Sequence, residues 1–354
     1  MSQRVKRRGS FERFRPFTIG ITATSACVPE FELELGVKRL KNLGYQVRIH
    51  PIVTEQYRFF AGRDEERIAA FLELARDPEV DAIWCARGGY GALRVIEGIE
   101  QAKRIPAGKL LLGYSDVTAL LDFVRERWKW DAIHSPMPGT REFSLLPEED
   151  WKSLVQVLQS FAKKASGKSV LPALSHRLDY IGPVRPKAPI EAPMVGGNLT
   201  VWDTLVGTRY QGKSTGRILF FEDVTESWYR VDRMLNHLRQ SGALKGARAL
   251  VLGTWSDCTD SAMKVLAQQV PEHLNVQEAL RDPGAAGIAL KPLRPTFSGD
   301  VLLKEIFGEF SVRTGIPVLK GFPAGHGPRY APIPMGRRWR LEKSGRLSLL
   351  DRRL

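Results

Sequence analysis

Residues 109–124, KLLLGYSDVTALLDFV, join an apolar strand pattern that ends at Gly113 to a helical pattern that follows at once. The same alternation of short apolar runs and amphipathic helical patterns extends along the first half of the chain. The strand-like runs are FTIGITA (17–23), QVRIHPI (46–52), VDAIWCA (80–86) and KLLLGYS (109–115), and the helical patterns cover residues 30–43, 64–77 and 116–127. Strands that alternate with helices predict a parallel sheet covered by helices on both faces.

The length of 354 residues favours two domains. A helical pattern from Glu148 to Lys163 closes the first unit, and residues 164–188, rich in Ser, Gly and Pro, lose the periodicity. Beyond them, strand runs, a helical pattern and a final hairpin pattern predict a second, mixed unit. We therefore expect an N-terminal α/β domain over residues 1–163, a linker over 164–188 and a mixed α/β C-terminal domain over 189–354.

The composition is that of an ordinary globular protein, with 43% hydrophobic and 26% charged residues. No apolar run reaches the roughly 20 residues that a membrane span needs, so we expect no membrane insertion and a cytoplasmic location. The three cysteines have no CxxC spacing, and Cys85 lies within an apolar run that is better interpreted as a buried strand. The six histidines form no HExxH pair, so neither a metal nor another cofactor is expected.

The formal net charge of +14 is concentrated at the two ends of the chain, in residues 1–15 and 336–354. Basic arms of this kind can bind nucleic acid or anionic lipid. No recognised nucleic-acid-binding motif accompanies them, so we interpret them as solvated tails and do not expect a nucleic-acid partner.

Ser115 stands in the turn of LLLGYSDVTALL, between the strand pattern and the helix pattern. A serine there would present its hydroxyl at the carboxyl end of a parallel sheet, where open α/β sheets bind ligands. The start of the helix supplies free N–H groups that favour a developing oxyanion. The turn resembles a nucleophile elbow but lacks the second glycine of G-x-S-x-G. On this segment alone, a simple helix cap is the plainer interpretation.

Three further strand ends carry polar or glycine-rich sequences: WCARGGYGALRV (84–95), FFEDVTESWYRVDR (220–233) and GFPAGHGPRYAPIPMG (321–336). Taken singly, they indicate a tight turn, a capping acid and an exposed loop histidine. Together they place a serine, a carboxylate at Glu222 and a histidine at His326 in that order, each at a strand end. Groups of these three kinds act as a unit on unrelated folds, and the glycine turn offers a second oxyanion donor.

The motifs RGGYGA, LLGYSDVTAL, GGNLTVWDTLVGT, FFEDVTESWYRVDRML and PVLKGFPAGHGPR, in this order and spacing, resemble the muramoyltetrapeptide LD-carboxypeptidase family. The family also contains microcin immunity peptidases. The resemblance implies a flavodoxin-like N-terminal domain, a smaller swivelling α/β domain, a homodimer and no cofactor. It also implies that Ser115 is the nucleophile, Glu222 the acid and His326 the base, with the Gly89 and Asp116 amides as oxyanion donors. The implied reaction releases terminal D-Ala from murein tetrapeptide in cell-wall recycling.

Two features leave the substrate open. A carboxypeptidase must bind a free carboxylate, for which Arg87 and Arg329 are the candidates, and Asn198 is a further candidate for binding the substrate. Residues 256–303 are weakly patterned and are interpreted as an insertion that lengthens the chain beyond the family pattern.

One alternative is the related immunity activity on aminoacyl-nucleotide conjugates, for which Trp202, Trp228 and Trp255 could provide base stacking. A second alternative is a non-catalytic, two-domain protein whose basic tails bind an anionic polymer.

Overall fold

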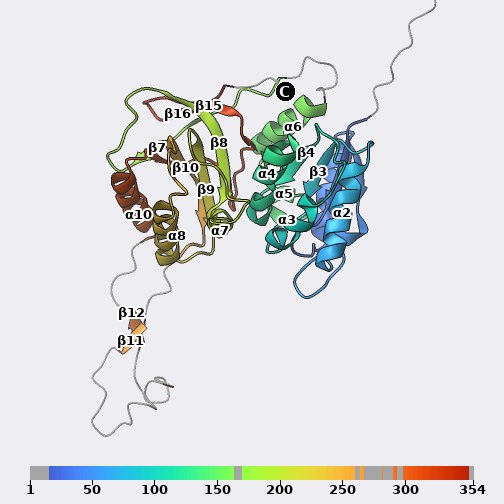
Figure 1. Ribbon diagram of the computed structural model, residues 1–354, viewed down its shortest axis with the longest axis horizontal. Coiled ribbons are helices and arrows are strands. Elements are labelled where there is room, and N and C mark those ends of the chain that lie inside the picture. The colour runs from blue at the N-terminus through green and yellow to red at the C-terminus, as the bar shows by residue number, and fades with distance from the viewer. Residues whose placement is uncertain are drawn as a thin grey trace, which may run out of the picture.

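The computed structural model describes residues 16–162, 170–259, 264–266, 281, 290–292 and 298–350. Figure 1 shows two α/β units side by side, with α4 of the first unit facing α7 and β8 of the second. The predicted tail 1–15 and most of the predicted insertion 256–303 lie outside the described residues. The other predicted tail, 336–354, is not a solvated tail as far as it is described, because Arg338–Leu341 and Arg346–Leu349 are strands of the second sheet. No helix within the described ranges is long and apolar enough to cross a membrane.

The N-terminal unit is built on a sheet whose parallel strands run in the order β2-β1-β3-β4-β5. These strands are β1 (Thr18–Thr22), β2 (Gln46–Ile49), β3 (Ala82–Cys85), β4 (Leu110–Gly113) and β5 (Asp131–His134). This is the flavodoxin-like order, which confirms the fold class expected for this half of the chain. The strand order reverses between β1 and β3, and ligands bind beyond the carboxyl ends of the strands at such a point.

Two layers of helices accompany this sheet: α2, α3 and α4 pack in sequence, and α1 packs against α5. Their bounds are α1 (Glu30–Asn42), α2 (Asp64–Arg76), α3 (Ala92–Glu100), α4 (Thr118–Phe123), α5 (Arg141–Ser144) and α6 (Glu148–Ala162). Short helical turns complete the unit: η1 (Pro51–Val53), η2 (Ser115–Val117) and the π-helical η3 (Val124–Trp128). The helix predicted over residues 116–127 is therefore three consecutive segments of different pitch, η2, α4 and η3.

A strand from the far end of the chain completes the N-terminal sheet. β14 (Ile333–Pro334) pairs antiparallel with β5, with Ile333 opposite His134. The Met335 amide donates to the Ala132 carbonyl at 2.9 Å, and the next amide, of Gly336, donates to the Met194 carbonyl of the second unit at 2.7 Å. The C-terminal segment thus crosses from one sheet to the other within a few residues.

The second unit is built on a mixed eight-stranded sheet in the order β6-β16-β15-β8-β9-β10-β13-β7. Its strands are β6 (Ser175–Arg177), β7 (Asp179–Ile181), β8 (Ile190–Asn198), β9 (Ile218–Val224), β10 (Ala249–Ser256), β13 (Val318–Lys320), β15 (Arg338–Leu341) and β16 (Arg346–Leu349). Its helices are α7 (Leu199–Thr204), α8 (Trp228–Gln240) and α10 (Gly299–Thr314), and the short strands β11 (Lys264–Leu266) and β12 (Leu290–Pro292) pair with each other. The mixed second unit was predicted, and the structure confirms it.

The segment expected to be a linker contributes to this sheet. Within residues 164–188, β6 pairs with β16, and β7 pairs with β13. These strands are only three residues long and lie at the two edges of the sheet, which explains why periodicity did not reveal them.

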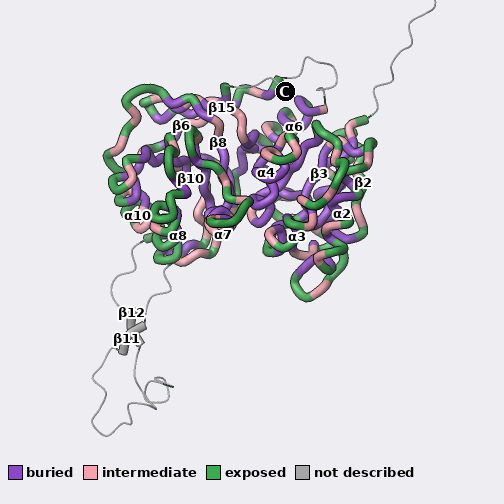
Figure 2. The backbone as a smooth tube through the Cα atoms, viewed as in Figure 1, coloured by how far each residue is buried: buried purple, intermediate pink, exposed green. Residues whose placement is uncertain are grey.

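Buried segments run through both units (Figure 2), and most of the residues buried there are apolar. One cluster runs from the N-terminal strands and helices to one face of the second sheet, through residues such as Leu112, Phe220 and Trp339. A second cluster packs the other face of that sheet against α7, α8 and α10. The two units therefore share a continuous apolar interior rather than meeting across a polar gap.

Candidate active site

Ser115 occupies a strained turn directly after β4. Its φ angle is 60°, in the left-handed region that a residue with a side chain rarely adopts. The residue is half-buried and begins η2, so the turn raises its hydroxyl at the carboxyl edge of the sheet. This backbone is the one expected of a nucleophile elbow, despite the missing second glycine.

The glycine loop after β3 comes up against this serine. A Cβ atom at Gly88 would lie 2.8 Å from Ser115 Oγ and 3.4 Å from the Asp116 amide nitrogen, so a side chain there would displace the serine. The Gly88 carbonyl accepts from the Ala26 amide at 3.1 Å, which fixes the loop to the segment after β1. Gly89 has a φ of 106°. The two predicted oxyanion donors, the amides of Gly89 and Asp116, thus belong to loops that converge on Ser115.

The Asp116 carboxylate lies beneath the same turn. It is buried and accepts from Ser25 Oγ at 2.5 Å and from the Ala92 amide at 2.7 Å. Burial raises the pKa of this carboxyl, although both hydrogen bonds and the charge of Arg67 act in the opposite direction. Asp116 therefore ties the serine turn to the loop after β1 and to the start of α3.

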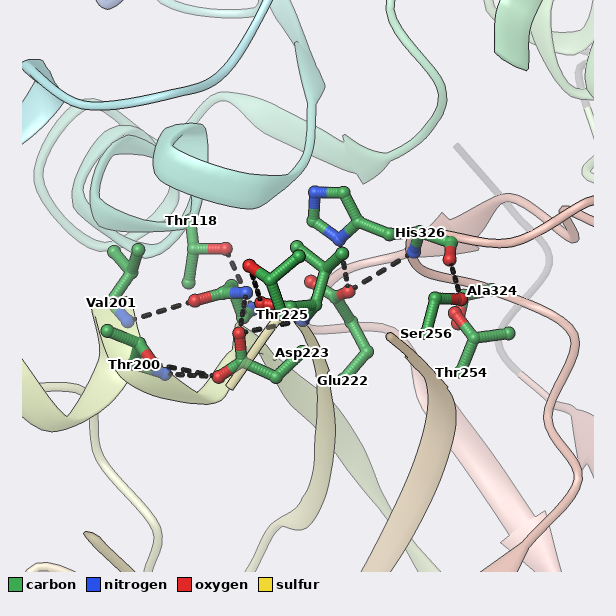
Figure 3. A network of polar contacts seen from close by, with 12 residues as sticks. Thr118, Thr200, Val201, Glu222, Asp223, Thr225, Thr254, Ser256, Ala324 and His326 are labelled. Atoms are coloured by element: carbon green, nitrogen blue, oxygen red, sulfur yellow. Dashed lines mark hydrogen bonds and ion pairs between the residues drawn. The ribbon is translucent and has the colours of Figure 1, made fainter. Parts of the chain in front are cut away.

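Glu222 and His326 form a hydrogen-bonded pair at the carboxyl ends of strands in the second sheet (Figure 3). His326 Nδ1 lies 2.8 Å from Glu222 Oε2, and the same oxygen accepts from the His326 amide at 3.3 Å. The Glu222 side chain is fully buried, whereas 20% of the His326 side chain is exposed. Gly325, with a φ of 116°, permits this approach, because a Cβ there would lie 2.8 Å from Glu222 Oε2.

The contact between Glu222 and His326 favours the charged form of each side chain. Burial disfavours the imidazolium, but the Glu222 carboxylate outweighs it, so the pKa of His326 is raised above its ordinary value of 6.5. Burial likewise favours protonated Glu222, but the charge and hydrogen bonds of His326 outweigh it, so the pKa of Glu222 is lowered. Glu222 is therefore an anion that holds Nδ1 and leaves Nε2 of the ring available.

An aromatic contact places His326 next to the turn that contains Ser115. Tyr114, the residue before Ser115, packs on His326 with ring centroids 4.7 Å apart. Figure 3 shows the His326 ring directed from the second unit toward the N-terminal unit. No hydrogen bond between the described side chains of Ser115 and His326 is formed, which is common in catalytic sites without substrate.

The three predicted substrate-binding residues have different surroundings. Arg87 is exposed beside the glycine loop, and its Nη1 donates to the Cys27 carbonyl at 3.1 Å. Asn198 is buried; its side chain donates to Asp223 at 2.9 Å and accepts from the Val201 amide at 3.1 Å. Both side-chain atoms of Asn198 are thus engaged in holding β8, α7 and β9 together.

Arg329, the third of these residues, is paired with α6. Its Nε and Nη2 donate to the two carboxylate oxygens of Asp150 at 2.7 and 3.1 Å, and Nη2 lies 2.6 Å from Glu149. Both arginines are exposed, but the guanidinium of Arg329 is paired with two carboxylates, whereas that of Arg87 donates to a neutral backbone carbonyl next to the converging loops.

Several side chains around the site were not singled out from the sequence. His134 at the end of β5 is fully buried and lies 2.7 Å, Nδ1 to hydroxyl, from Tyr330. Thr118 Oγ1 accepts from the Asn198 amide at 3.0 Å and so joins the two units beside Glu222 (Figure 3). The strand-end position of His134 was a usable signal, but its partner Tyr330 is 196 residues away in sequence.

The described residues offer no cluster of metal ligands. Within the described ranges, no group of three or more His, Cys, Asp or Glu side chains could hold a metal ion. Cys85 is buried in β3, as predicted, and burial raises the pKa of its thiol to about 12.

Comparison with known proteins places this geometry in a family. Residues 19–135 match the LD-carboxypeptidase N-terminal domain, and residues 191–289 match the LD-carboxypeptidase C-terminal domain. A putative carboxypeptidase of Rickettsia prowazekii is 31% identical over 255 residues, which cover 71% of this chain and 76% of the relative. The murein tetrapeptide carboxypeptidase of Pseudomonas aeruginosa is 27% identical over 323 residues, which cover 90% of this chain and 91% of the relative.

Solved structures agree with the two-unit architecture. The muramoyltetrapeptide carboxypeptidase from Oxalobacter formigenes superposes with a TM-score of 0.64 at 27% identity, covering 94% of this chain and 97% of that one. The microcin C7 self-immunity protein MccF in complex with aspartyl sulfamoyl adenosine gives a TM-score of 0.69 at 20% identity, covering 96% and 97%. The second likeness is one of fold alone.

Both domain matches and the named relatives place the chain among the serine carboxypeptidases. This chain is a member of the LD-carboxypeptidase family, as the sequence motifs predicted.

Proposed function

We propose that this protein is a serine LD-carboxypeptidase that releases terminal D-Ala from murein tetrapeptide in cell-wall recycling. The observation that carries the proposal is the Glu222–His326 pair, 2.8 Å apart, directed at the serine turn with φ 60° at Ser115. The names of the relatives, a murein tetrapeptide carboxypeptidase and a muramoyltetrapeptide carboxypeptidase, support the choice of substrate.

The reaction follows from the roles of these three residues. His326 Nε2 accepts the Ser115 proton while Oγ bonds to the scissile carbonyl carbon, and the amides of Gly89 and Asp116 donate to the oxyanion. The protonated ring then gives its proton to the leaving amine as the C–N bond breaks. Water, activated by the same ring, releases the acyl group and restores the serine, while Glu222 stabilises the imidazolium at each step.

Arg87 is our candidate for the substrate carboxylate. Its guanidinium is exposed and lies on the same loop as Gly88 and Gly89, at the edge of the proposed oxyanion hole. Cleavage of a terminal residue requires the substrate carboxylate to be bound close to the reacting carbonyl, and a guanidinium on this loop suits that role.

The immunity activity on aminoacyl-nucleotides has less support from the residues that were expected to stack a base. Trp202 and Trp228 are buried in the second unit, each 2% exposed. Trp255 is half-buried between Trp228 and Phe307, with ring centroids 6.0 and 5.1 Å apart. These three rings are therefore packing residues of the second apolar cluster.

Stereochemistry at the scissile bond is the direct test. We expect murein tetrapeptide to lose its terminal D-Ala about 10²- to 10³-fold faster than the matching peptide ending in L-Ala. With the carbonyl held by two amides and the carboxylate held by a guanidinium, inversion at the last α-carbon tilts the carbonyl off a donor, and one lost donor costs about that factor. Parallel time courses measured by mass spectrometry check it, with an aminoacyl-nucleotide conjugate as a third substrate. Equal rates on the two peptides contradict the proposal, and turnover of the conjugate alone favours the immunity activity.

The pH dependence follows from the Glu222–His326 pair. Only the neutral imidazole accepts the serine proton, and the pKa of His326 is raised above 6.5. We therefore expect kcat/KM to rise with pH through a midpoint above 6.5, with the inactive protonated form below it. A pH–rate profile on one peptide substrate measures the midpoint. A rate that is flat or falls from about pH 6 to 8 contradicts the assignment of His326 as the base.

The family resemblance also leads us to propose a homodimer in the cytoplasm. Sedimentation equilibrium of the purified protein tests the first of these, and cell fractionation tests the second.

A further inference from the structure

The segment that follows His326 is attached to the N-terminal unit as well as to its own. In the second unit, the His326 carbonyl accepts from Ser256 Oγ, and the histidine side chain is bound to Glu222. Four residues further on, at Tyr330, the chain enters contacts with α6 and β5 of the N-terminal unit. The histidine therefore lies on a short bridge between the two units.

Asp150 forms the first attachment on the N-terminal side. This carboxylate on α6 is buried, and it accepts from Arg329 Nε at 2.7 Å, from Arg329 Nη2 at 3.1 Å and from the Tyr330 amide at 2.9 Å. A bidentate guanidinium–carboxylate pair fixes orientation as well as distance. The hydrogen bond from the Tyr330 amide fixes the backbone of the segment as well as the Arg329 side chain.

His134 forms the second attachment. Its Nδ1 lies 2.7 Å from the Tyr330 hydroxyl, and both side chains are almost fully buried, at 0% and 1% exposure. Burial lowers the pKa of His134 to about 4 and raises that of Tyr330 well above 10. The bond therefore joins two neutral groups throughout the pH range in which His326 titrates.

One aromatic ring connects these attachments to the reacting groups. Tyr114 contacts three rings at once, with centroids 5.4 Å from Tyr330, 5.7 Å from His134 and 4.7 Å from His326. Because Tyr114 precedes Ser115 in the chain, the packing that positions Tyr330 also positions the serine turn against the histidine ring.

We propose that Asp150, His134 and Tyr330 are positioning residues that set the distance between His326 and Ser115 across the two units. The inference rests on the proposed function, since it assigns these residues to the same serine–histidine reaction. Glu222 fixes the direction of the imidazole from the second unit only. The separation between the ring and a serine on the other unit needs a contact that spans both, and the segment through Tyr330 supplies it.

Two variants test this role. Asp150→Asn keeps the shape and an acceptor for the Tyr330 amide but removes the buried one of the two carboxylate charges that bind Arg329. Tyr330→Phe keeps the ring packing but removes the hydroxyl that bonds to His134. For each, we expect kcat on murein tetrapeptide to fall about 10- to 100-fold, because misplacement of about 1 Å costs up to that factor. KM should stay within about threefold, since neither side chain meets the substrate.

Asp131→Asn is the matched control. Asp131 lies at the opposite end of β5 from His134, and its carboxylate binds Arg337 at 2.5 Å, which also ties the C-terminal segment to this strand. This variant should lower the melting temperature about as much as Asp150→Asn while leaving kcat within about twofold of the wild type. Each of the two variants removes a carboxylate that binds an arginine of the C-terminal segment. Comparing them therefore separates an effect on stability from an effect on catalysis.

The rate at which a fluorophosphonate labels Ser115 gives a second readout that needs no peptide. It should fall in Asp150→Asn and Tyr330→Phe by the same factor as kcat, and stay unchanged in Asp131→Asn. If Asp150→Asn and Tyr330→Phe label as fast as wild type, or if all three variants lose kcat in proportion to their melting temperatures, the positioning role is wrong. If the wild-type serine is not labelled and no peptide is cleaved, the proposed function itself fails and this inference falls with it.

Discussion

Ser115→Ala is expected to lower kcat on murein tetrapeptide by about 10³- to 10⁶-fold, the range seen when a triad nucleophile is removed. The variant deletes one oxygen from a half-buried side chain, so the fold and the Glu222–His326 pair should be retained. Alanine at position 115 would be as strained as serine at a φ of 60°, so the free energy of unfolding should change little. Steady-state kinetics with a melting curve measures both effects.

Ser135→Ala is the control for this substitution. Ser135 follows β5, the neighbour of β4, and its hydroxyl is buried without a hydrogen-bond partner among the described residues. Activity within about twofold of the wild type is expected, since the hydroxyl bonds to nothing that the reaction uses. Near-normal turnover by Ser115→Ala, with Ser135→Ala unchanged, would show that the nucleophile lies elsewhere.

Glu222→Gln has the second-largest expected effect, a loss in kcat of about 10³- to 10⁴-fold, as for a triad acid converted to its amide. The glutamine retains the shape of a fully buried side chain but removes the charge that stabilises the imidazolium. It also removes the charge that raises the pKa of His326, so the midpoint of the remaining activity should move to lower pH. A pH–rate profile of the variant therefore reports the loss and its electrostatic cause together.

Asp223→Asn provides the matched comparison, because Asp223 is the next carboxylate on the same strand. Its oxygens accept from Asn198 at 2.9 Å and from Thr200 Oγ1 at 2.8 Å, and none of its hydrogen bonds goes to His326. We expect a loss at least about a hundredfold smaller than that of Glu222→Gln. Equal losses in the two variants would mean that Glu222 acts only as a buried structural charge.

Features encoded by neighbouring residues were predicted from the sequence. The apolar runs gave β1, β3 and β4, and the helical patterns gave α1, α2 and α6 within a residue or two of their observed bounds. The position of Ser115, Glu222 and His326 at strand ends follows from the same local patterns, because a strand end is visible wherever an apolar run stops.

Features that depend on distant pairing were not predicted. β14 is two residues long and has no pattern of its own; it is a strand only because β5 lies beside it. Arg329 has the sequence context of an exposed loop cation, and its pairing with Asp150 spans 179 residues. The tryptophans were considered as stacking residues only for the alternative immunity activity, and amphipathic helix positions such as Trp228 face the core of the second unit.

The crossing of the C-terminal segment has a consequence for biosynthesis. As the chain emerges from the ribosome, the strands through β5 can form a sheet whose outer edge is unpaired, and such an edge invites aggregation. β14, the strand that pairs with this edge, is synthesised about 200 residues later. The His134–Tyr330 hydrogen bond next to it spans 196 residues of sequence. Contacts this distant in sequence slow folding, because the connecting chain must be ordered before they form. β14, which covers the exposed edge of β5, is synthesised just after His326. The nascent chain therefore covers this edge and completes the proposed catalytic site in one late step.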